Sequence, residues 1–234
     1  MDKYLKNNYE FWQYGYNAPN VENVIFRLHG RILKHKYKLP HVKKPTVVLD
    51  FGCGQGAIVN YFHLQGYDAY GVDLSITDIE IAKRRYPHIA HKFRLCKPDV
   101  FNTPMTRFTD NKKITLITGQ QAVYYFDKVH FSKLMKNFRN SLVPKGLIYA
   151  SMMSHEHTYY KFSKKTKYKW LRETTFTGKR FKVKKYFNFH CETKKDVIDK
   201  FSIFKPVYVG SYHLEIEPDE TNNHHFVILC QKKS

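Results

Sequence analysis

The feature that most constrains the fold is a glycine-rich turn that directly follows an apolar run. Residues 47–51 read Val-Val-Leu-Asp-Phe, and Gly52, Gly54 and Gly56 follow at alternate positions. The apolar run predicts a buried strand of a parallel sheet. The glycines predict a tight turn where the backbone can approach a ligand closely, because no Cβ intervenes. With a helix expected over 57–65, this is the strand–turn–helix at which open α/β sheets bind nucleotide-like ligands.

A second strand is expected from Asp68 to Asp73, and it ends in an acid 21 positions after Gly52. An acid about 20 residues beyond the first glycine can accept hydrogen bonds from both hydroxyls of a ribose. The glycine turn, the helix and Asp73 together predict a mononucleotide half-site. Because Gly52, Gly54 and Ala57 also fit a relaxed dinucleotide fingerprint, a nicotinamide-dependent oxidoreductase is an alternative.

Three segments resemble the class I S-adenosylmethionine-dependent methyltransferases. They are Leu49-Asp50-Phe51-Gly52-Cys53-Gly54-Gln55-Gly56, Gly71-Val72-Asp73-Leu74-Ser75 and Leu142-Val143-Pro144-Lys145-Gly146-Leu147. The third is similar to the family's turn before the fifth strand, with Leu147 where a second glycine is usual. The resemblance covers residues 37–153 well and the C-terminal third in outline. It implies S-adenosylmethionine as methyl donor and S-adenosylhomocysteine as product.

The fold class expected is α/β, with a Rossmann-like, doubly wound, mostly parallel sheet of seven strands. Beyond the first two strands, the expected ones are 93–96, 114–118, 147–153 and a C-terminal antiparallel hairpin of 207–215 with 224–230. An alternating strand is also expected over 181–190. Helices are expected after Ser75, over 127–142 and after Thr193. One methyltransferase domain then spans 1–234. Its expected parts are a helical lid (1–40), a cofactor-binding core (41–153), a basic aromatic acceptor cap (154–190) and a C-terminal helix and hairpin (191–234).

The residues expected to bind the cofactor lie in the glycine turn and after the neighbouring strands, because strand carboxyl ends face the ligand crevice. Asp99 is placed by the resemblance, which puts an acid near the adenine amino group. Tyr14 and Tyr16 belong to an N-terminal aromatic cluster that could equally pack on the core. The full set is Asp50, Gly52, Cys53, Gly54, Gly56, Asp73, Leu74, Asp99, Val100, Gln120, Tyr14 and Tyr16.

Methyl transfer from a sulfonium mainly requires alignment, and a general base helps when the acceptor is a hydroxyl. His155 follows the fifth strand at the crevice end and is the first candidate for this base, with Tyr124 as a second candidate catalytic residue. Further candidate bases are His157, His190, His224 and His225. Tyr124 and Tyr125 could equally be buried core tyrosines.

The formal net charge is +20, and cations crowd the segment 154–186 among aromatic side chains. Such a field attracts anions, which favours a small anionic acceptor that is phosphorylated, nucleotide-linked or a sugar, methylated at oxygen. Decoration of a bacterial glycan or capsule is one setting for such enzymes. The same surface suits RNA or tRNA methylation, the second hypothesis. A non-catalytic binding module that keeps the cofactor fold is the third.

Several motifs that are absent from the sequence make some reaction types and locations less favoured. The segment Thr118-Gly119-Gln120-Gln121 lacks the Asn/Asp-Pro-Pro-Tyr motif of many amino-group methyltransferases and the Pro-Cys nucleophile of cytosine C5 enzymes. The four cysteines have no metal-ligand spacing, so no metal is expected. No apolar run is long enough to span a bilayer and the N-terminus lacks a signal-peptide core, so the expected location is the cytoplasm.

Overall fold

The computed structural model describes residues 27–33, 46–175, 185–213 and 223–233. Internal contacts divide the chain into two compact units, Met1–His41 and Val42–Ser234. In the first unit the described residues include a π-helical element, η2 (Leu28–Leu33), within the region where apolar spacing predicted a helix. Tyr14, Tyr16 and the other residues of the expected lid, apart from 27–33, lie outside the described residues.

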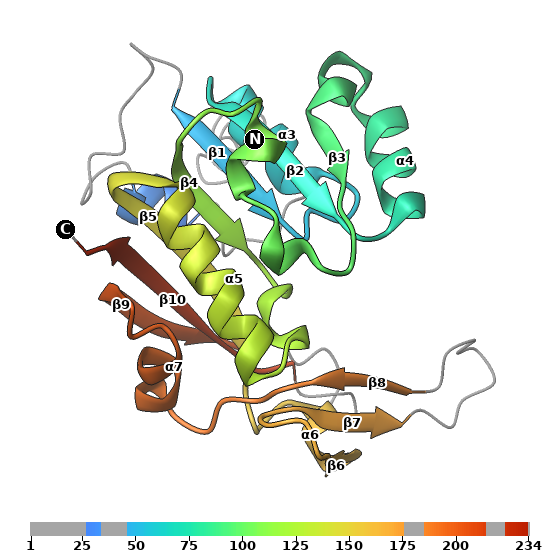
Figure 1. Ribbon diagram of the computed structural model, residues 1–234, viewed down its shortest axis with the longest axis vertical. Coiled ribbons are helices and arrows are strands. Elements are labelled where there is room, and N and C mark those ends of the chain that lie inside the picture. Colours follow the sequence, from blue (N-terminus) through green and yellow to red (C-terminus); the bar gives the residue numbers. More distant parts are fainter. Residues whose placement is uncertain (1–26, 34–45, 176–184, 214–222, 234) are drawn as a thin grey trace, which may run out of the picture. The chain divides into compact units, whose positions relative to one another are not determined.

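The second unit contains a seven-stranded sheet in the order β3-β2-β1-β4-β5-β10-β9 (Figure 1). Its first five strands in sequence run parallel, and β10 is antiparallel to both β5 and β9. This arrangement confirms the predicted α/β fold, including the C-terminal hairpin. The bounds are β1 (Val47–Phe51), β2 (Asp68–Asp73), β3 (Phe93–Leu95), β4 (Ile114–Gly119), β5 (Leu142–Met153), β9 (Phe204–Tyr212) and β10 (His225–Lys232).

The fifth strand begins five residues earlier than expected, at Leu142 instead of Leu147. Leu142 pairs with Ile114 of β4, and the register then shifts so that Leu147 pairs with Leu116. Lys145 takes a positive φ of 60° inside this irregularity. The segment predicted as a turn is therefore an irregular part of the strand, because its ends stay paired with β4.

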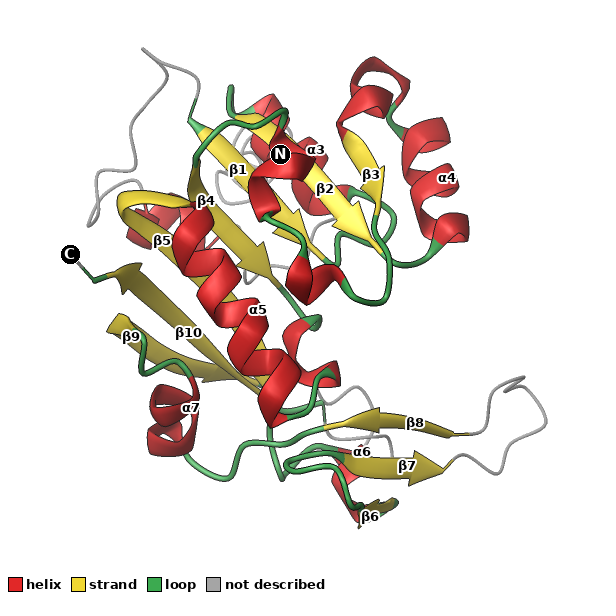
Figure 2. Ribbon diagram, in the orientation of Figure 1, coloured by secondary structure: helices red, strands yellow, loops and turns green. Residues whose placement is uncertain are grey.

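The sheet carries helices whose starts follow the expected capping rules. Ser75 Oγ accepts from the Asp78 N–H, and Thr193 Oγ1 accepts from the Asp196 N–H, so both predicted caps are confirmed. Helix α5 crosses one face of the sheet and α3 lies on the other (Figure 2). The helices are α3 (Ala57–Leu64), α4 (Ile76–Arg85), α5 (Lys128–Ser141), α6 (Thr158–Lys161) and α7 (Lys194–Lys200). Shorter 3₁₀ segments are η3 (Pro87–Lys92), η4 (Val100–Asn102), η5 (Met105–Thr109) and η6 (Val123–Tyr125).

The core lies between α5 and the sheet. All five residues of β1 are buried, as expected of a central parallel strand. On α5 the buried residues recur at helical spacing and form one apolar face, as predicted. They are Phe131, Leu134, Met135, Phe138 and Ser141. None of the helices in the described ranges combines the length and apolar character needed to cross a membrane.

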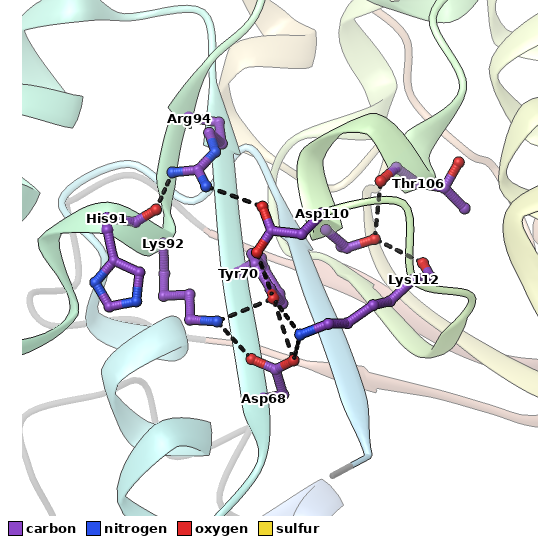
Figure 3. Close-up of polar contacts among 9 residues, drawn as sticks. Asp68, Tyr70, His91, Lys92, Arg94, Thr106, Asp110 and Lys112 are labelled. Carbon is purple, nitrogen blue, oxygen red and sulfur yellow. Dashed lines mark hydrogen bonds and ion pairs between the residues drawn. The ribbon is translucent and has the colours of Figure 1, made fainter.

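A charged network joins β2 to its neighbours away from the glycine turn. Figure 3 shows the hydroxyl of buried Tyr70 among the carboxylates of Asp68 and Asp110 and the amines of Lys92 and Lys112. Burial raises the pKa of Asp68, but hydrogen bonds and charge from Lys112 and Lys92 outweigh it and lower that pKa below its usual value. The network therefore holds η3 and the segment after η5 against β2.

The expected cap contains a second, three-stranded antiparallel sheet in the order β6-β7-β8. Its strands are β6 (Ser163–Lys165), β7 (Arg172–Thr175) and β8 (Lys185–Asn188). The strand predicted over 181–190 is thus seen for 185–188, while 176–184 lie outside the described residues. Backbone bonds from Phe189 N to Tyr124 O (2.9 Å) and from Cys191 N to Met153 O (2.8 Å) join the cap to the ends of η6 and β5.

Candidate functional site

The turn after β1 has the conformation that its glycines predicted. The φ values of Gly52, Gly54 and Gly56 are +73°, +49° and +84°, which residues other than glycine rarely adopt. The N–H groups of Gly52 and Cys53 both donate to Val72 O, at 2.8 and 3.1 Å, so the turn is held against the end of β2. The turn therefore lies at the carboxyl edge of two adjacent parallel strands.

The three glycines are required for different reasons. A Cβ on Gly52 would lie 2.4 Å from the Ala122 Cβ, and one on Gly56 would lie 2.6 Å from the Phe93 ring. A Cβ on Gly54 would meet no atom within 4 Å. Gly52 and Gly56 thus allow close packing inside the protein, whereas Gly54 presents bare backbone to open space.

Asp73 ends β2 and faces this turn. Its Oδ2 accepts from the Gly54 N–H and its Oδ1 from the Ser75 N–H, both at 2.8 Å. Each carboxylate oxygen has two lone pairs, so each can accept one further hydrogen bond. The carboxylate is therefore oriented by the backbone and retains capacity for the two hydroxyls of a ribose.

Asp50 lies on β1 directly before the turn and is 1% exposed. Its Oδ1 accepts from Thr118 Oγ1 at 2.6 Å, while Oδ2 has no hydrogen-bond partner among the described residues. Burial raises the pKa of Asp50 to about 7, although the Thr118 bond acts in the opposite direction. An unpaired buried carboxylate oxygen is costly, so a positive charge bound nearby would stabilise its ionised form.

A cavity of about 230 Å³ opens beside the turn. Asp73 and Leu74 contribute from the end of β2, and Gln121, Ala122 and Tyr125 from the segment after β4. The full lining is Phe51, Gly52, Val72, Asp73, Leu74, Cys96, Gln121, Ala122, Tyr125 and Phe126. Carboxyl ends of parallel strands thus surround the cavity, as the sheet topology predicts.

Other residues expected at the cofactor lie beside the cavity or point elsewhere. The Cys53 side chain is buried and packs so closely on Gly71 that a Cβ there would lie 2.8 Å from the Cys53 Sγ. Asp99 is exposed and Val100 is buried, and Cys96 is the residue of this segment that lines the cavity.

After β4, the cavity is lined by the second member of each predicted pair. Gln121 lines it rather than Gln120, and Tyr125 rather than Tyr124. Gln121 takes a positive φ of 52°, its N–H donates to Ser151 Oγ at 2.7 Å, and its amide donates to Tyr212 Oη at 3.1 Å. The sequence does not show which residue of each pair lines the cavity. The alternating pattern of strand side chains ends before Gln121, whose φ is left-handed.

The candidate base His155 is exposed and is absent from the residues described as lining the cavity. Its N–H donates to Cys191 O at 3.0 Å, and its ring lies edge-on to Tyr160, 6.3 Å between centroids. Other histidines are more enclosed. His157 and His225 are buried, with rings 5.2 Å apart and perpendicular. Burial lowers the pKa of each to about 4, so both are neutral at pH 7.

A family model for the methyltransferase domain matches residues 22–186. The chain belongs to the S-adenosylmethionine-dependent methyltransferases. This match confirms the family, the enzyme class and the cofactor that the glycine turn and its resemblance predicted. None of the curated proteins matches the chain.

Many solved structures share the fold of this methyltransferase. An S-adenosylmethionine-dependent methyltransferase from Methanosarcina mazei is 18% identical, with a TM-score of 0.63 over 85% of this chain and 97% of that chain. Another from Clostridium acetobutylicum is 15% identical, with a TM-score of 0.62 and complete coverage of both chains. The 1,6-didemethyltoxoflavin-N1-methyltransferase of Burkholderia thailandensis, bound to its acceptor and S-adenosylhomocysteine, is 15% identical, with a TM-score of 0.56 over 98% and 84% of the two chains.

The residues of the site fit the family's cofactor. S-adenosylmethionine carries a ribose, an ammonium and a sulfonium. Asp73 keeps lone pairs that could accept from ribose hydroxyls, and the Oδ2 of Asp50, which has no partner among the described residues, suits a nearby positive charge. The open space at Gly54 leaves room for the methionine portion against the backbone. A cavity with few charged groups also suits an adenine ring beside Leu74 and Cys96.

The described part of this methyltransferase shows no evident metal site. Across residues 27–33, 46–175, 185–213 and 223–233, no three His, Cys, Asp or Glu side chains are grouped so that they could hold an ion. All four cysteines are buried and free. The expected lack of a metal stays a prediction.

Proposed function

We propose that this methyltransferase transfers a methyl group to a hydroxyl oxygen of a small anionic acceptor. The bound cofactor supplies an activated methyl group. The protein holds the acceptor in line with that group and excludes water, and the geometry accounts for most of the rate enhancement. Phosphorylated sugars and nucleotide-linked metabolites are the acceptor classes that fit best.

The observation that carries this proposal is a basic, aromatic pocket of about 320 Å³ in the cap. Cations and aromatic rings alternate around it, which favours a ligand that has both negative charge and a flat or apolar face. Its lining is Tyr160, Lys165, Thr166, Tyr168, Lys169, Trp170, Leu171, Arg172, His190 and Glu192.

Arg172 is a cation of this pocket that contacts within the cap hold in place. Its Nε donates to Ser163 Oγ at 2.7 Å and its Nη2 to the Ser163 carbonyl at 2.8 Å. The guanidinium lies over the Tyr160 ring, 4.3 Å from the centroid. These contacts fix the plane of the guanidinium and use two of its five N–H groups. The remaining three N–H groups can bind a phosphate or carboxylate in a bidentate manner.

Oxygen as the acceptor atom is supported by the surroundings of the cavity. Tyr125 lines the cavity, and the adjacent Tyr124 lies 3.5 Å through its hydroxyl from the neutral imidazole of His225. A neutral imidazole can take the proton that a hydroxyl acceptor must lose. The Burkholderia neighbour is an N1-methyltransferase, so the shared fold is compatible with either atom.

RNA methylation is a second candidate, because the cap also exposes aromatic side chains among its lysines. Phe162 is 62% exposed and Tyr168 is 47% exposed. Exposed rings among cations can stack on unpaired bases. We rank this candidate second because the same lysines and rings also converge on a pocket of small-molecule size.

A panel of acceptors tests the proposal. Radiolabelled methyl transfer from S-adenosylmethionine is measured to sugar phosphates, nucleotides, neutral sugars and tRNA. We expect labelling of a phosphorylated small molecule, and a KM at least tenfold higher in Lys169→Glu than in Lys83→Glu, a matched charge reversal on exposed α4. Labelling of tRNA alone would favour the second candidate. Cofactor binding without transfer to any acceptor would favour a non-catalytic module.

A further inference from the structure

Hydrogen-bonding groups form a continuous chain from the cavity wall into the core. The Tyr125 hydroxyl begins it, since Tyr125 lines the cavity and is 45% exposed. The rings of Tyr125 and Tyr124 lie 4.7 Å apart between centroids, and a side-chain hydrogen bond with Tyr124 acts on the Tyr125 hydroxyl. The Tyr124 Oη lies 3.5 Å from His225 Nε2, and His225 Nδ1 lies 3.2 Å from the Asn223 carbonyl oxygen.

The last contact determines which proton His225 carries. A carbonyl oxygen can only accept, so Nδ1 must be the protonated nitrogen, and Nε2 then bears a lone pair directed at Tyr124. The 3.5 Å separation is long for a hydrogen bond. Bonds of this kind commonly tighten once the ligands are in place.

We propose that Tyr125, Tyr124 and His225 form a proton relay that removes the hydroxyl proton of the acceptor from the cavity. The inference rests on the proposed function, since it assumes a hydroxyl acceptor. It names the base that methyl transfer to oxygen uses, and it assigns that role to His225 acting through two tyrosines instead of to His155.

The proton count balances. As the acceptor oxygen bonds to the methyl carbon, the sulfur keeps the electron pair of the bond that breaks. The acceptor proton passes to Tyr125 Oη, the Tyr125 proton to Tyr124 Oη, and the Tyr124 proton to His225 Nε2. The positive charge lost by the sulfonium reappears on the imidazolium, and both tyrosines end neutral. The relay reverses to return the proton to water after the product leaves.

The surroundings of His225 keep its imidazole neutral before methyl transfer. It is 1% exposed, its ring stacks on Tyr212 at 5.3 Å and 8°, and it lies edge-on to His157. His157 and His224 act electrostatically on it and both lower its pKa further, and His190 also interacts with it electrostatically. Burial also raises the pKa of Tyr125, so this tyrosine passes a proton on without staying ionised.

The cavity end of the relay is fixed from the neighbouring strands. Gln121 lines the cavity beside Tyr125 and donates to the Tyr212 hydroxyl at 3.1 Å, and Tyr212 in turn stacks on His225. The Phe189 N–H bond to the Tyr124 carbonyl holds the backbone of Tyr124 from the side of the cap. Tyr212 of β9 and Phe189 of the cap thus contact the two inner members of the relay, His225 and Tyr124.

Nuclear magnetic resonance on histidine-labelled protein tests the relay without any acceptor. The His225 signals, assigned with His225→Gln, should report the Nδ1–H tautomer and a protonation midpoint below pH 5.5. Tyr124→Phe should shift the Nε2 resonance, while Tyr67→Phe, a buried tyrosine elsewhere, should leave it unchanged. An Nε2–H tautomer, or an Nε2 resonance indifferent to Tyr124→Phe, would overturn the relay.

Turnover supplies the second readout, with the hydroxyl acceptor that the panel identifies. Tyr124→Phe should lower kcat by roughly 10²-fold at an unchanged Kd for S-adenosylmethionine. Its residual kcat should rise with pH, because the proton then leaves to solvent. A variant as fast as Tyr67→Phe would refute the relay while leaving the proposed function intact. Wild-type protein that methylates no hydroxyl would refute the proposed function, and the resonance data would still decide the relay.

Discussion

The N–H of Gly54 donates to Oδ2 of Asp73 over 2.8 Å, so the glycine turn and the end of β2 are joined without a ligand. One contact connects the two sequence features that define the half-site. The carboxylate is oriented by backbone rather than by flexible side chains, which lowers the entropic cost of binding. Changes at these two residues should therefore affect cofactor binding before they affect the fold.

Gly54→Val should weaken S-adenosylmethionine binding by at least tenfold. The valine would occupy the open space beside the turn and strain a backbone with φ +49°. Calorimetric titration measures the affinity, and Gly52→Val is the contrasting variant. Its Cβ would collide with Ala122, so it should lower Tm more than Gly54→Val does. Unchanged affinity in Gly54→Val would remove Gly54 from the cofactor site.

Asp73→Ala should weaken cofactor binding by about 1.5–3 kcal/mol, the range for hydrogen bonds to a charged group. The variant loses the ribose acceptor and also the carboxylate that receives the Gly54 and Ser75 N–H groups. Asp73→Asn keeps one acceptor oxygen and should lie between the wild type and Asp73→Ala. The same titration measures all three proteins, and equal affinities would exclude a ribose at Asp73.

Much of the fold was predictable because its signals are local. Apolar runs marked β1, β2 and β4, and side-chain caps at Ser75 and Thr193 marked two helix starts. Glycines required by positive φ marked the ligand turn. In each case neighbouring residues alone determine the backbone, so no knowledge of distant contacts was needed.

The acceptor side was less predictable, because long-range packing decides it. His225 meets Tyr124 across 101 positions of sequence, and no local pattern shows that contact. Gln121 and Tyr125 line the cavity in place of Gln120 and Tyr124, and the left-handed φ of Gln121 has no signal in the sequence. His155 had the right position at the end of a strand, but its side chain is exposed.

Cofactor binding near pH 7 should release a proton from Asp50. Burial raises the pKa of Asp50 to about 7, so the carboxyl is partly protonated there, and a bound cation would favour the ionised form. Calorimetry in buffers of different ionisation enthalpy measures the release. It should vanish in Asp50→Asn, and a wild-type binding enthalpy independent of buffer would show that no cation lies near Asp50.

Stability should fall as the pH drops below 6.5. Burial lowers the pKa of His157 and His225 to about 4 and that of His190 to about 3. Between these values and 6.5 the unfolded chain binds more protons than the folded protein, so acid favours unfolding. Asp50 acts in the opposite direction, because its raised pKa favours the folded state at acid pH. It is one group against these three histidines, and His63 and His224, whose pKa values are also lowered, act with them.

Thermal unfolding from pH 8 to pH 5 measures this dependence. His225→Gln should show a shallower decline in Tm than the wild type, because one of the three histidines is removed. His88→Gln, at an exposed position, should retain the wild-type slope. A Tm that stays constant over this range in the wild type would contradict the burial of neutral histidines.

The most direct test of the central claim is a calorimetric titration of the wild-type protein with S-adenosylmethionine, S-adenosylhomocysteine and NADH. We expect micromolar binding of both sulfur compounds, no binding of NADH, and binding of the first two that is at least tenfold weaker in Gly54→Val. Binding of NADH alone, or of none of the three, would contradict the assignment of the cavity beside Gly54 and Asp73 as the methyl-donor site.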